Sequence, residues 1–327
     1  MLAAPDKFRG TARAPEVAAA VCRAVAAAGG TCDEAPMADG GEGTLDALGG
    51  PNRRATVTGP LGDPVEAAWR LDGRTAVIEM AQASGLELAG GPEGNDAMAA
   101  STYGTGELLA TAVERGAREI IVGVGGSATT DGGLGALRAL EPGPGLRGID
   151  VRVACDVRLP FVEAAEVFAP QKGASAAQVE LLRRRLERLA QLYVEDRGVD
   201  VRDLPGAGAA GGLAGGLAAA GATLESGFDL VADVVDLDVR LEGCDLVVTG
   251  EGFVDEQSFE GKVVGGVVEL AAAAGVPVLV VAGEVIEAVP GGVTAVSLTE
   301  RFGGERARLD TLACVEEVVA DHLRTLA

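Results

Sequence analysis

The stretch from Gly123 to Gly133, which reads GVGGSATTDGG, is the feature that most constrains how this chain can fold. The run 119–122 before it, which is apolar after Glu119, predicts a short buried strand, and residues 134–140 after it predict a helix. A glycine-rich turn between a strand and a helix lets backbone N–H groups converge on an anion at the helix N-terminus. The stretch therefore favours a phosphate-binding loop in an α/β fold. The alternative is a tight turn in which Asp131 caps the helix.

This glycine-rich loop also carries the hydroxyls and the acid that a bound phosphate and its metal ion need. Asp131 is a candidate for catalysis and for metal binding. The candidate phosphate and nucleotide ligands in the loop are Gly125, Gly126, Ser127, Thr129 and Thr130.

Two further loops that combine acids with glycines follow runs that predict strands. Asp39 and Glu42 come after residues 31–38, and Glu251 and Asp255 come after residues 245–249. In open α/β sheets, ligands bind beyond the C-terminal ends of the strands. Acids that share one cleft repel one another unless a cation or substrate hydroxyls lie among them. The three loops together therefore predict one site, although each acid alone also fits a cap or turn.

Lysine is rare in this chain, because Lys7, Lys172 and Lys262 are the only lysines among 27 basic residues. Lys172 and Lys262 both lie beside a glycine, where a flexible point charge suits a phosphate. We therefore interpret both as candidates for neutralising phosphate charge. The alternative for each is an exposed surface amine.

The composition excludes several classes of function. The net charge of −22 argues against nucleic acid or an anionic membrane as a partner, since both require a basic surface. The one histidine, His322, falls in a pattern that predicts a terminal amphipathic helix, so a histidine-based triad or metal cluster is not expected. The apolar positions of that pattern are Leu309, Leu312, Val319, Leu323 and Leu326.

The five cysteines are scattered and include no C-x-x-C pair, so neither a disulfide framework nor a zinc site is expected. The N-terminus carries charged residues at Asp6, Lys7 and Arg9, which predicts no secretory signal and a cytoplasmic location. Residues 206–224 carry no charge but consist mostly of alanine and glycine. They predict a closely packed helix rather than a membrane span.

Strand-like and helical runs alternate at both ends of the chain, whereas the middle differs. There, short strand-like runs at 56–58, 65–69 and 76–79 are separated by turn residues, which indicates an antiparallel piece. The fold class that we predict is α/β with two domains. One is a parallel α/β domain built from residues 1–54 and 226–327, and the other is a mixed α/β domain, residues 55–225, inserted into it.

Nine segments of this chain, in the same order and spread over most of its length, closely resemble type I glycerate kinases. They are Ala4–Gly10, Met37–Thr44, Val57–Gly62, Thr102–Glu107, Gly125–Gly133, Ala154–Asp156, Pro170–Gly173, Pro205–Gly212 and Val248–Gly252. The resemblance implies ATP-dependent phosphorylation of D-glycerate with Mg²⁺. It also implies a flavodoxin-like domain that carries an inserted second domain.

On this interpretation, each candidate residue takes a role in phosphoryl transfer. Asp131, Asp255 and Lys262 are the predicted catalytic residues, and Asp131 and Glu251 the predicted metal ligands. Arg9 pairs with the glycerate carboxylate, and Asp39 and Glu42 hold its hydroxyls. Lys172 joins the phosphate ligands. The sequence leaves open which acid is the general base and whether the product is 2- or 3-phosphoglycerate.

The chain departs from the family pattern at three places. Residues 6–10 read DKFRG where family members usually have Asp-Ser-Phe-Lys-Gly, and the segments 141–150 and 158–169 are shorter than usual. Two alternatives therefore stay open: a kinase for another small hydroxy acid, and a non-catalytic protein that binds glycerate or nucleotide. The oligomeric state also stays open, with a homodimer among the states allowed.

Overall fold

The computed structural model of the chain describes residues 1–143, 145–259, 262–286 and 293–326. The chain divides into two compact units. Unit 1 comprises Met1–Asp39, Asp46–Leu48 and Phe228–Ala327, and unit 2 comprises Gly40–Leu45 and Gly49–Gly227. Both ends of the chain therefore belong to one unit, and most of the middle belongs to the other.

Unit 1 is built on a five-stranded parallel sheet with the strand order β11-β10-β9-β1-β2. Counted along the chain within this unit, that order is 2-1-3-4-5, the order of flavodoxin-like folds. The α/β, flavodoxin-like class predicted from the sequence is thus confirmed. The strands are β1 (Leu2–Ala3), β2 (Asp33–Glu34), β9 (Val247–Val254), β10 (Val278–Val285) and β11 (Thr294–Ser297).

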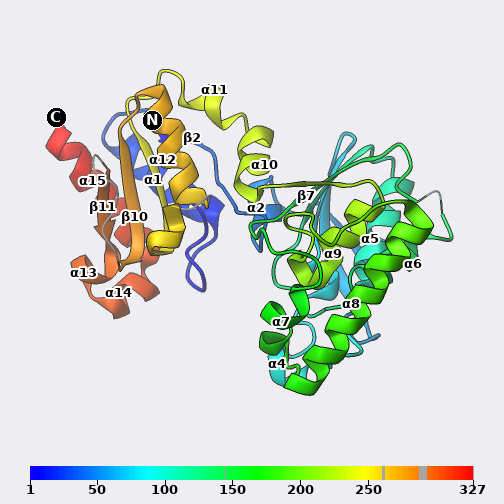
Figure 1. Cartoon of the computed structure of the whole chain (residues 1–327). Helices are drawn as coiled ribbons and strands as arrows, with labels where there is room; N and C mark the ends of the chain where they lie inside the picture. Colours follow the sequence, from blue (N-terminus) through cyan, green and yellow to red (C-terminus); the bar gives the residue numbers. More distant parts are fainter. Residues whose placement is uncertain (144, 260–261, 287–292, 327) are drawn as a thin grey trace. The chain divides into compact units, whose positions relative to one another are not determined.

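Helices cover both faces of this sheet (Figure 1). Successive strand residues point to opposite faces, so Leu2 joins the core under one set of helices and Ala3 the core under the other. The first set is α10 (Gly227–Val234), α11 (Leu237–Leu241) and α12 (Val263–Ala274). The second is α1 (Ala14–Ala27), α13 (Leu298–Phe302), α14 (Gly304–Leu309) and α15 (Thr311–Leu326). Two short elements, α2 (Thr44–Ala47) and η2 (Glu256–Phe259), lie in the loops.

One cysteine pair corrects the expectation drawn from the sequence. Cys22 in α1 and Cys32, just before β2, form a disulfide with their Cα atoms 5.2 Å apart. The chain turns back after α1 to enter the sheet beside β1, and this turn brings together two cysteines that are ten residues apart. Cys155, Cys244 and Cys314 are free.

Unit 2 contains a six-stranded mixed sheet with the order β3-β4-β5-β6-β7-β8. The first three strands pair antiparallel, as the sequence predicted, and the remaining pairs are parallel. The strands are β3 (Arg53–Thr58), β4 (Pro64–Asp72), β5 (Thr75–Glu79), β6 (Glu119–Gly123), β7 (Asp150–Ala154) and β8 (Thr223–Glu225). The helices are α3 (Ala81–Ser84), α4 (Gly91–Gly94), α5 (Tyr103–Glu114), α6 (Leu134–Leu140), α7 (Ala164–Phe168), η1 (Pro170–Lys172), α8 (Ala176–Arg197) and α9 (Ala209–Ala219).

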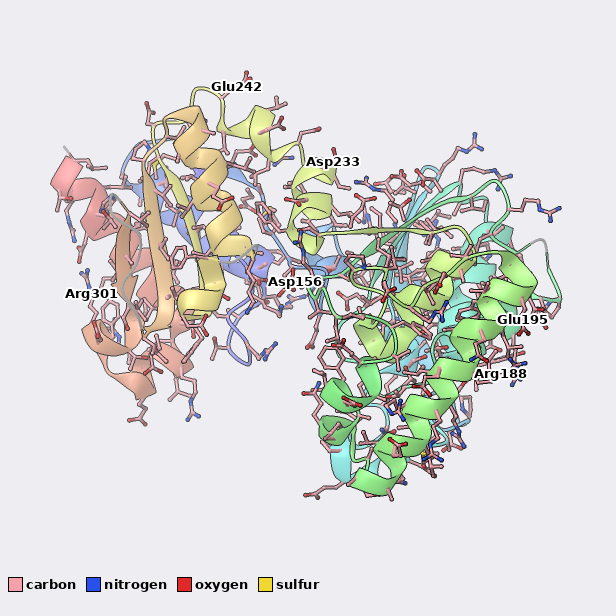
Figure 2. All side chains as sticks on the ribbon, in the orientation of Figure 1. Asp156, Arg188, Glu195, Asp233, Glu242 and Arg301 are labelled. Carbon is pink, nitrogen blue, oxygen red and sulfur yellow. A yellow bond between two sulfur atoms is a disulfide. The ribbon has the colours of Figure 1, made fainter. Side chains whose placement is uncertain are left out.

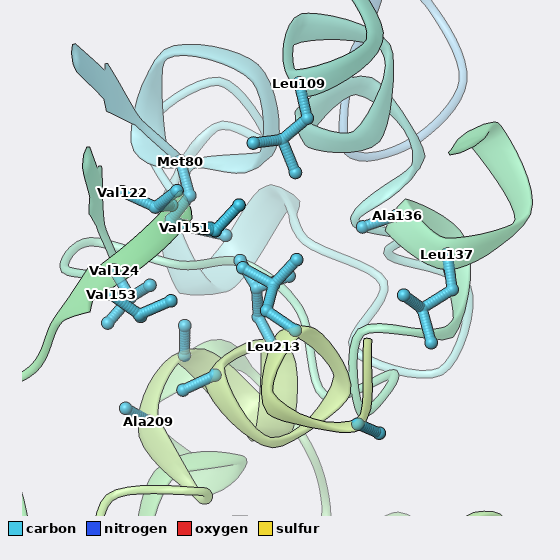
Figure 3. Close-up of a cluster of buried hydrophobic side chains, with 14 of the residues drawn as sticks. Met80, Leu109, Val122, Val124, Ala136, Leu137, Val151, Val153, Ala209 and Leu213 are labelled. Carbon is cyan, nitrogen blue, oxygen red and sulfur yellow. The ribbon is translucent and has the colours of Figure 1, made fainter. Parts of the chain in front are cut away.

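The core of unit 2 is made mainly of valine, leucine and alanine. Figure 3 shows Val122 of β6 and Val153 of β7 in one cluster with Leu213 of α9 and Leu109 of α5. Every residue of α9 is buried, as expected for a closely packed helix of small residues. Within the described part of the chain, no helix is both long and apolar enough to span a membrane.

Candidate active site

Unit 1 holds a pocket of about 390 Å³ beyond the C-terminal ends of its strands. Its lining comes from the segments that follow β1 and β2 and from the end of β9 onward. The strand order reverses between β1 and β9, and this switch point is where flavodoxin-like folds bind ligands. We name it the acid pocket, because four of its lining residues are acids: Asp6, Asp39, Glu251 and Asp255. The other lining residues are Lys7, Arg9, Gly252, Phe253, Ser258 and Lys262.

The acid pocket brings together five residues that the sequence singled out: Arg9, Asp39, Glu251, Asp255 and Lys262. Glu42, predicted as a substrate ligand, is exposed and belongs to unit 2. Asp131 and the predicted phosphate ligands also belong to unit 2.

Asp6 is the most perturbed carboxyl group of the acid pocket. It is 5% exposed, and burial raises its pKa to about 7. Lys7 opposes this rise, since its Nζ lies 3.7 Å from the Asp6 carboxylate and its backbone N–H donates to the same oxygen at 2.6 Å. Asp39 and Glu251 add to the rise through their charge. A carboxyl group that titrates near pH 7 is suited to proton transfer at that pH.

Lys7 links two acids of the pocket, because its Nζ also lies 3.9 Å from the Asp39 carboxylate. Sequence reasoning did not place Asp6, Lys7 or Ser258 in the site. The signal for the first two was present, since they belong to the same short motif as Arg9, directly after β1.

Glu251 is suited to binding a cation. Its Oε1 is buried and has no hydrogen-bond partner within the described residues, and burial raises the pKa of its carboxyl group. Nearby Asp255 accepts a hydrogen bond from the Ser258 backbone N–H at 3.0 Å. No cluster of three or more metal-ligating side chains occurs in the described part of the chain. Mg²⁺ commonly uses only one or two carboxylates together with substrate phosphates and water, so this pair fits it.

In unit 2, the glycine-rich loop is largely buried. Thr129 is 0% and Thr130 2% exposed, whereas Gly126 is exposed and Gly125 half-buried. The loop is held from behind by α9, where Gly211 has a φ of +67° and an added Cβ would lie 1.9 Å from the Thr129 carbonyl oxygen. Only glycine fits this position.

Lys172 is not the exposed amine that the sequence allowed as an alternative. It is 3% exposed, and its Nζ donates to Ser127 Oγ and to the Thr129 carbonyl, both at 2.7 Å. Burial lowers its pKa to about 7, and the charge of Asp131 opposes this. Lys172 therefore ties η1 to the glycine-rich loop.

The Asp131 carboxylate binds backbone N–H groups at the start of α6, although the N-cap residue of that helix is Gly133. Its carboxylate accepts hydrogen bonds from the backbone N–H groups of Thr102, Gly133 and Gly135 at 2.8–3.1 Å. It also accepts from the hydroxyls of Thr102 and, at 3.5 Å, Ser101. These bonds join the start of α5 to the start of α6, which favours a structural role for Asp131 close to the capping alternative.

An Asp131→Asn variant separates this structural role from the predicted catalytic role. The amide offers one oxygen, and its NH₂ group would face a backbone donor, so we expect the free energy of unfolding to fall by about 1–3 kcal/mol. We expect kcat, corrected for the folded fraction, to change by less than about threefold. Chemical unfolding and steady-state kinetics measure the two quantities. A stable variant with a kcat lowered more than tenfold would restore the catalytic assignment.

A second glycine-rich segment, residues 40–44, packs against the loop within unit 2. A Cβ on Gly125 would lie 2.6 Å from the Gly41 Cα, so the two backbones are in close contact. Buried Glu79 accepts hydrogen bonds from the backbone N–H groups of Gly43 and Leu45, both at 2.8 Å. This acid holds the segment that carries Glu42.

Comparison with known proteins decides the family. The model of the glycerate kinase family matches residues 1–143 and 141–303. The chain belongs to the glycerate kinase family. It is 41% identical over 324 residues to a protein of Escherichia coli K12 named glycerate 2-kinase, and the match covers 87% of this chain and 85% of that protein. The Bacillus subtilis glycerate kinase is 40% identical, with the same coverage.

A solved structure agrees. The crystal structure of a protein named as a glycerate kinase 2, from Salmonella typhimurium LT2, superposes with a TM-score of 0.87 at 36% identity. The match covers 99% of this chain and 97% of that one. The family resemblance predicted from nine motifs is therefore confirmed, and the chain is an enzyme of a kinase family.

Proposed function

We propose that this enzyme phosphorylates D-glycerate with ATP and Mg²⁺. The acid pocket is the observation that carries the proposal, because it places acids and basic groups together at the switch point of the flavodoxin-like sheet. The relative from Escherichia coli is named glycerate 2-kinase, which supports 2-phosphoglycerate as the product.

The basic and acidic groups of the acid pocket take different parts in this reaction. Arg9 pairs with the glycerate carboxylate, since a guanidinium matches a carboxylate in two parallel hydrogen bonds. Asp39 accepts a hydrogen bond from a glycerate hydroxyl. Asp6 accepts the proton of the attacking hydroxyl, because its pKa near 7 lets it hold and release a proton at that pH.

Other residues of the two units bind the phosphate groups and the metal ion. Glu251, with its unpartnered oxygen, and Asp255 hold Mg²⁺, which when bound neutralises charge on the transferred phosphoryl group. Lys262 adds a positive charge to the same pocket. In unit 2, Gly125 and Gly126 are the accessible part of the glycine-rich loop and present backbone N–H groups to phosphate. Buried Lys172 holds the loop in place through its hydrogen bonds to Ser127 and Thr129.

The test is an assay that couples ADP release to a detectable reaction, with ATP, Mg²⁺ and D-glycerate. We expect turnover that depends on all three, and phosphorus NMR of the product should show a 2-phosphate. L-glycerate and other small hydroxy acids serve as control substrates. Binding of D-glycerate without ADP release would identify the non-catalytic alternative, and faster turnover of another hydroxy acid would identify a different substrate.

A further inference from the structure

Unit 2 holds a second cavity that none of the proposed roles uses. It has a volume of about 470 Å³ and lies between α6, α8 and the segment 97–103. Small-molecule sites commonly measure about 300–1,000 Å³, and glycerate alone would leave most of this one empty. We name it the arginine cavity. Its charged lining residues are Asp131, Arg138, Arg185 and Arg188.

The arginine cavity is positively charged in a strongly acidic chain. Arg138, Arg185 and Arg188 line it, and Asp131 is the sole acid among its described lining residues. The Asp131 carboxylate already accepts several hydrogen bonds from the protein. The ion pair of Arg188 with Glu195, which Figure 2 shows on the same stretch of α8, joins side chains that are 58% and 56% exposed, so it is weak. Arg185 donates a hydrogen bond to the Met98 carbonyl oxygen at 3.0 Å, and Arg188 donates one to Gln191 at 3.1 Å. Both bonds are exposed, so these two arginines can exchange them for bonds to an anionic ligand.

Apolar side chains make up much of the remaining lining of the arginine cavity. They are Met98, Leu134 of α6 and three leucines of α8, Leu186, Leu189 and Leu192, and the ring of Tyr103, which also lines the cavity, is 37% exposed. Apolar walls favour a flat, weakly hydrated ring, and guanidinium groups can stack on such a ring or bind phosphate. The cavity thus suits a ligand with an aromatic part and an anionic part.

Thr130 connects the arginine cavity to the glycine-rich loop. It lines the cavity and is 2% exposed, and its Oγ1 has no hydrogen-bond partner within the described residues. Burial of a hydroxyl without a partner costs free energy. Because Oγ1 itself is buried, a ligand in the cavity would form a hydrogen bond with it only after the Thr130 side chain turns.

We propose that the arginine cavity binds the nucleotide of the kinase reaction, with its base against the leucines and its phosphates facing the arginines. This inference rests on the proposed function, because the proposed reaction requires a nucleotide. The acid pocket is a poorer site for a polyanion, because it is lined by four carboxyl groups and three basic groups. Thr130 lines the cavity and belongs to the glycine-rich loop, so the cavity adjoins the loop whose Gly125 and Gly126 are proposed to bind the transferred phosphoryl group.

The test uses single alanine variants of Arg138 and Arg185, which are exposed and should fold. We expect each to raise the KM for ATP and the Kd for ADP at least tenfold, about 1.4 kcal/mol, with the KM for D-glycerate changed less than twofold. Arg184→Ala is the matched control, since Arg184 lies on α8, is 66% exposed and does not line the cavity. We expect it to change neither constant.

Steady-state kinetics and titration calorimetry with ADP measure these quantities in the full-length protein. Unchanged values in both arginine variants would overturn the cavity assignment and leave the proposed reaction intact. Loss of ADP binding in the variants, together with no turnover of D-glycerate by the unmodified chain, would support the nucleotide site and reject the proposed substrate. A fall in ADP affinity in Arg184→Ala equal to that in the other variants would show a general charge effect and overturn the assignment.

Discussion

An Asp6→Asn variant should lose at least about 100-fold in kcat with D-glycerate. A positioned general base contributes about 10²–10⁴-fold, and an amide cannot accept the hydroxyl proton. The KM for ATP should change little, since Asp6 has no part in nucleotide binding in the proposed mechanism. Single-turnover kinetics measure the chemical step. A variant with at least a third of the original rate would show that another acid is the base, and Asp39→Asn is the next variant to measure.

The pH dependence provides a second measurement of the same group. Below about pH 7, Asp6 becomes protonated and cannot act as a base, so kcat/KM of the unmodified enzyme should fall as the pH is lowered. Burial is the main cause of the raised pKa of Asp6; the charge of Lys7 lowers it, and the charges of Asp39 and Glu251 raise it. In Asp6→Asn, the residual rate should no longer show this step. A step of the same size in both proteins would assign the titration to another group.

The effect of pH on stability should be opposite to its effect on kcat/KM: the contribution of Asp6 to stability should increase as the pH is lowered. The folded-state pKa of Asp6, about 7, lies above its ordinary value of 3.8, so between these pH values the folded state binds more protons than the unfolded state. The contribution of Asp6 to stability is therefore greatest below about pH 4 and is lost as the pH rises through about 7. Asp6→Asn should remove this part of the pH dependence of unfolding.

Much of the fold could be predicted because its signals are local and periodic. The short apolar runs of unit 1 and the antiparallel runs of unit 2 follow from alternation and turn residues. The surface of the last helix shows the limit of this reasoning. Leu309, predicted on its apolar face, instead ends α14 and is 69% exposed, and Leu326 at the end of α15 is 64% exposed, while Cys314 and Val318 are buried. Helix ends extend past the core, and a pattern of apolar residues does not show where the core stops.

The site could be predicted only in part, for a different reason. Acids that follow parallel strands can be found in the sequence, because strand ends of one sheet share an edge. The burial of a side chain depends on residues that are distant in the sequence, and burial is the main cause of the shifted pKa values of Asp6 and Lys172. A lysine beside a glycine suggests an accessible amine, but the folded chain surrounds Lys172 and commits its Nζ to Ser127 and Thr129. The Cys22–Cys32 disulfide likewise depends on where the chain turns back.

Lys262→Ala should lower kcat on the order of 30-fold or more. Lys262 precedes α12 as its N-cap residue and lines the acid pocket, and its charge lowers the pKa of Glu251. In the proposed mechanism its amine contacts the phosphoryl group as charge develops there, so its effect is greatest in the transition state. Loss of a desolvated charge contact costs about 2–5 kcal/mol, and about 1.4 kcal/mol corresponds to tenfold in rate.

Lys262→Arg is the control that gives this prediction its meaning. It keeps the positive charge but replaces a compact ammonium with a longer, planar guanidinium that needs a different geometry. A surface charge would tolerate this change, as the many arginines elsewhere in the chain indicate. A phosphate contact in a pocket of about 390 Å³ should not tolerate it. We therefore expect the fall in log kcat for Lys262→Arg to be at least half of the fall measured for Lys262→Ala. Full activity in the arginine variant, with less than a threefold loss in the alanine variant, would place Lys262 among the ordinary surface charges.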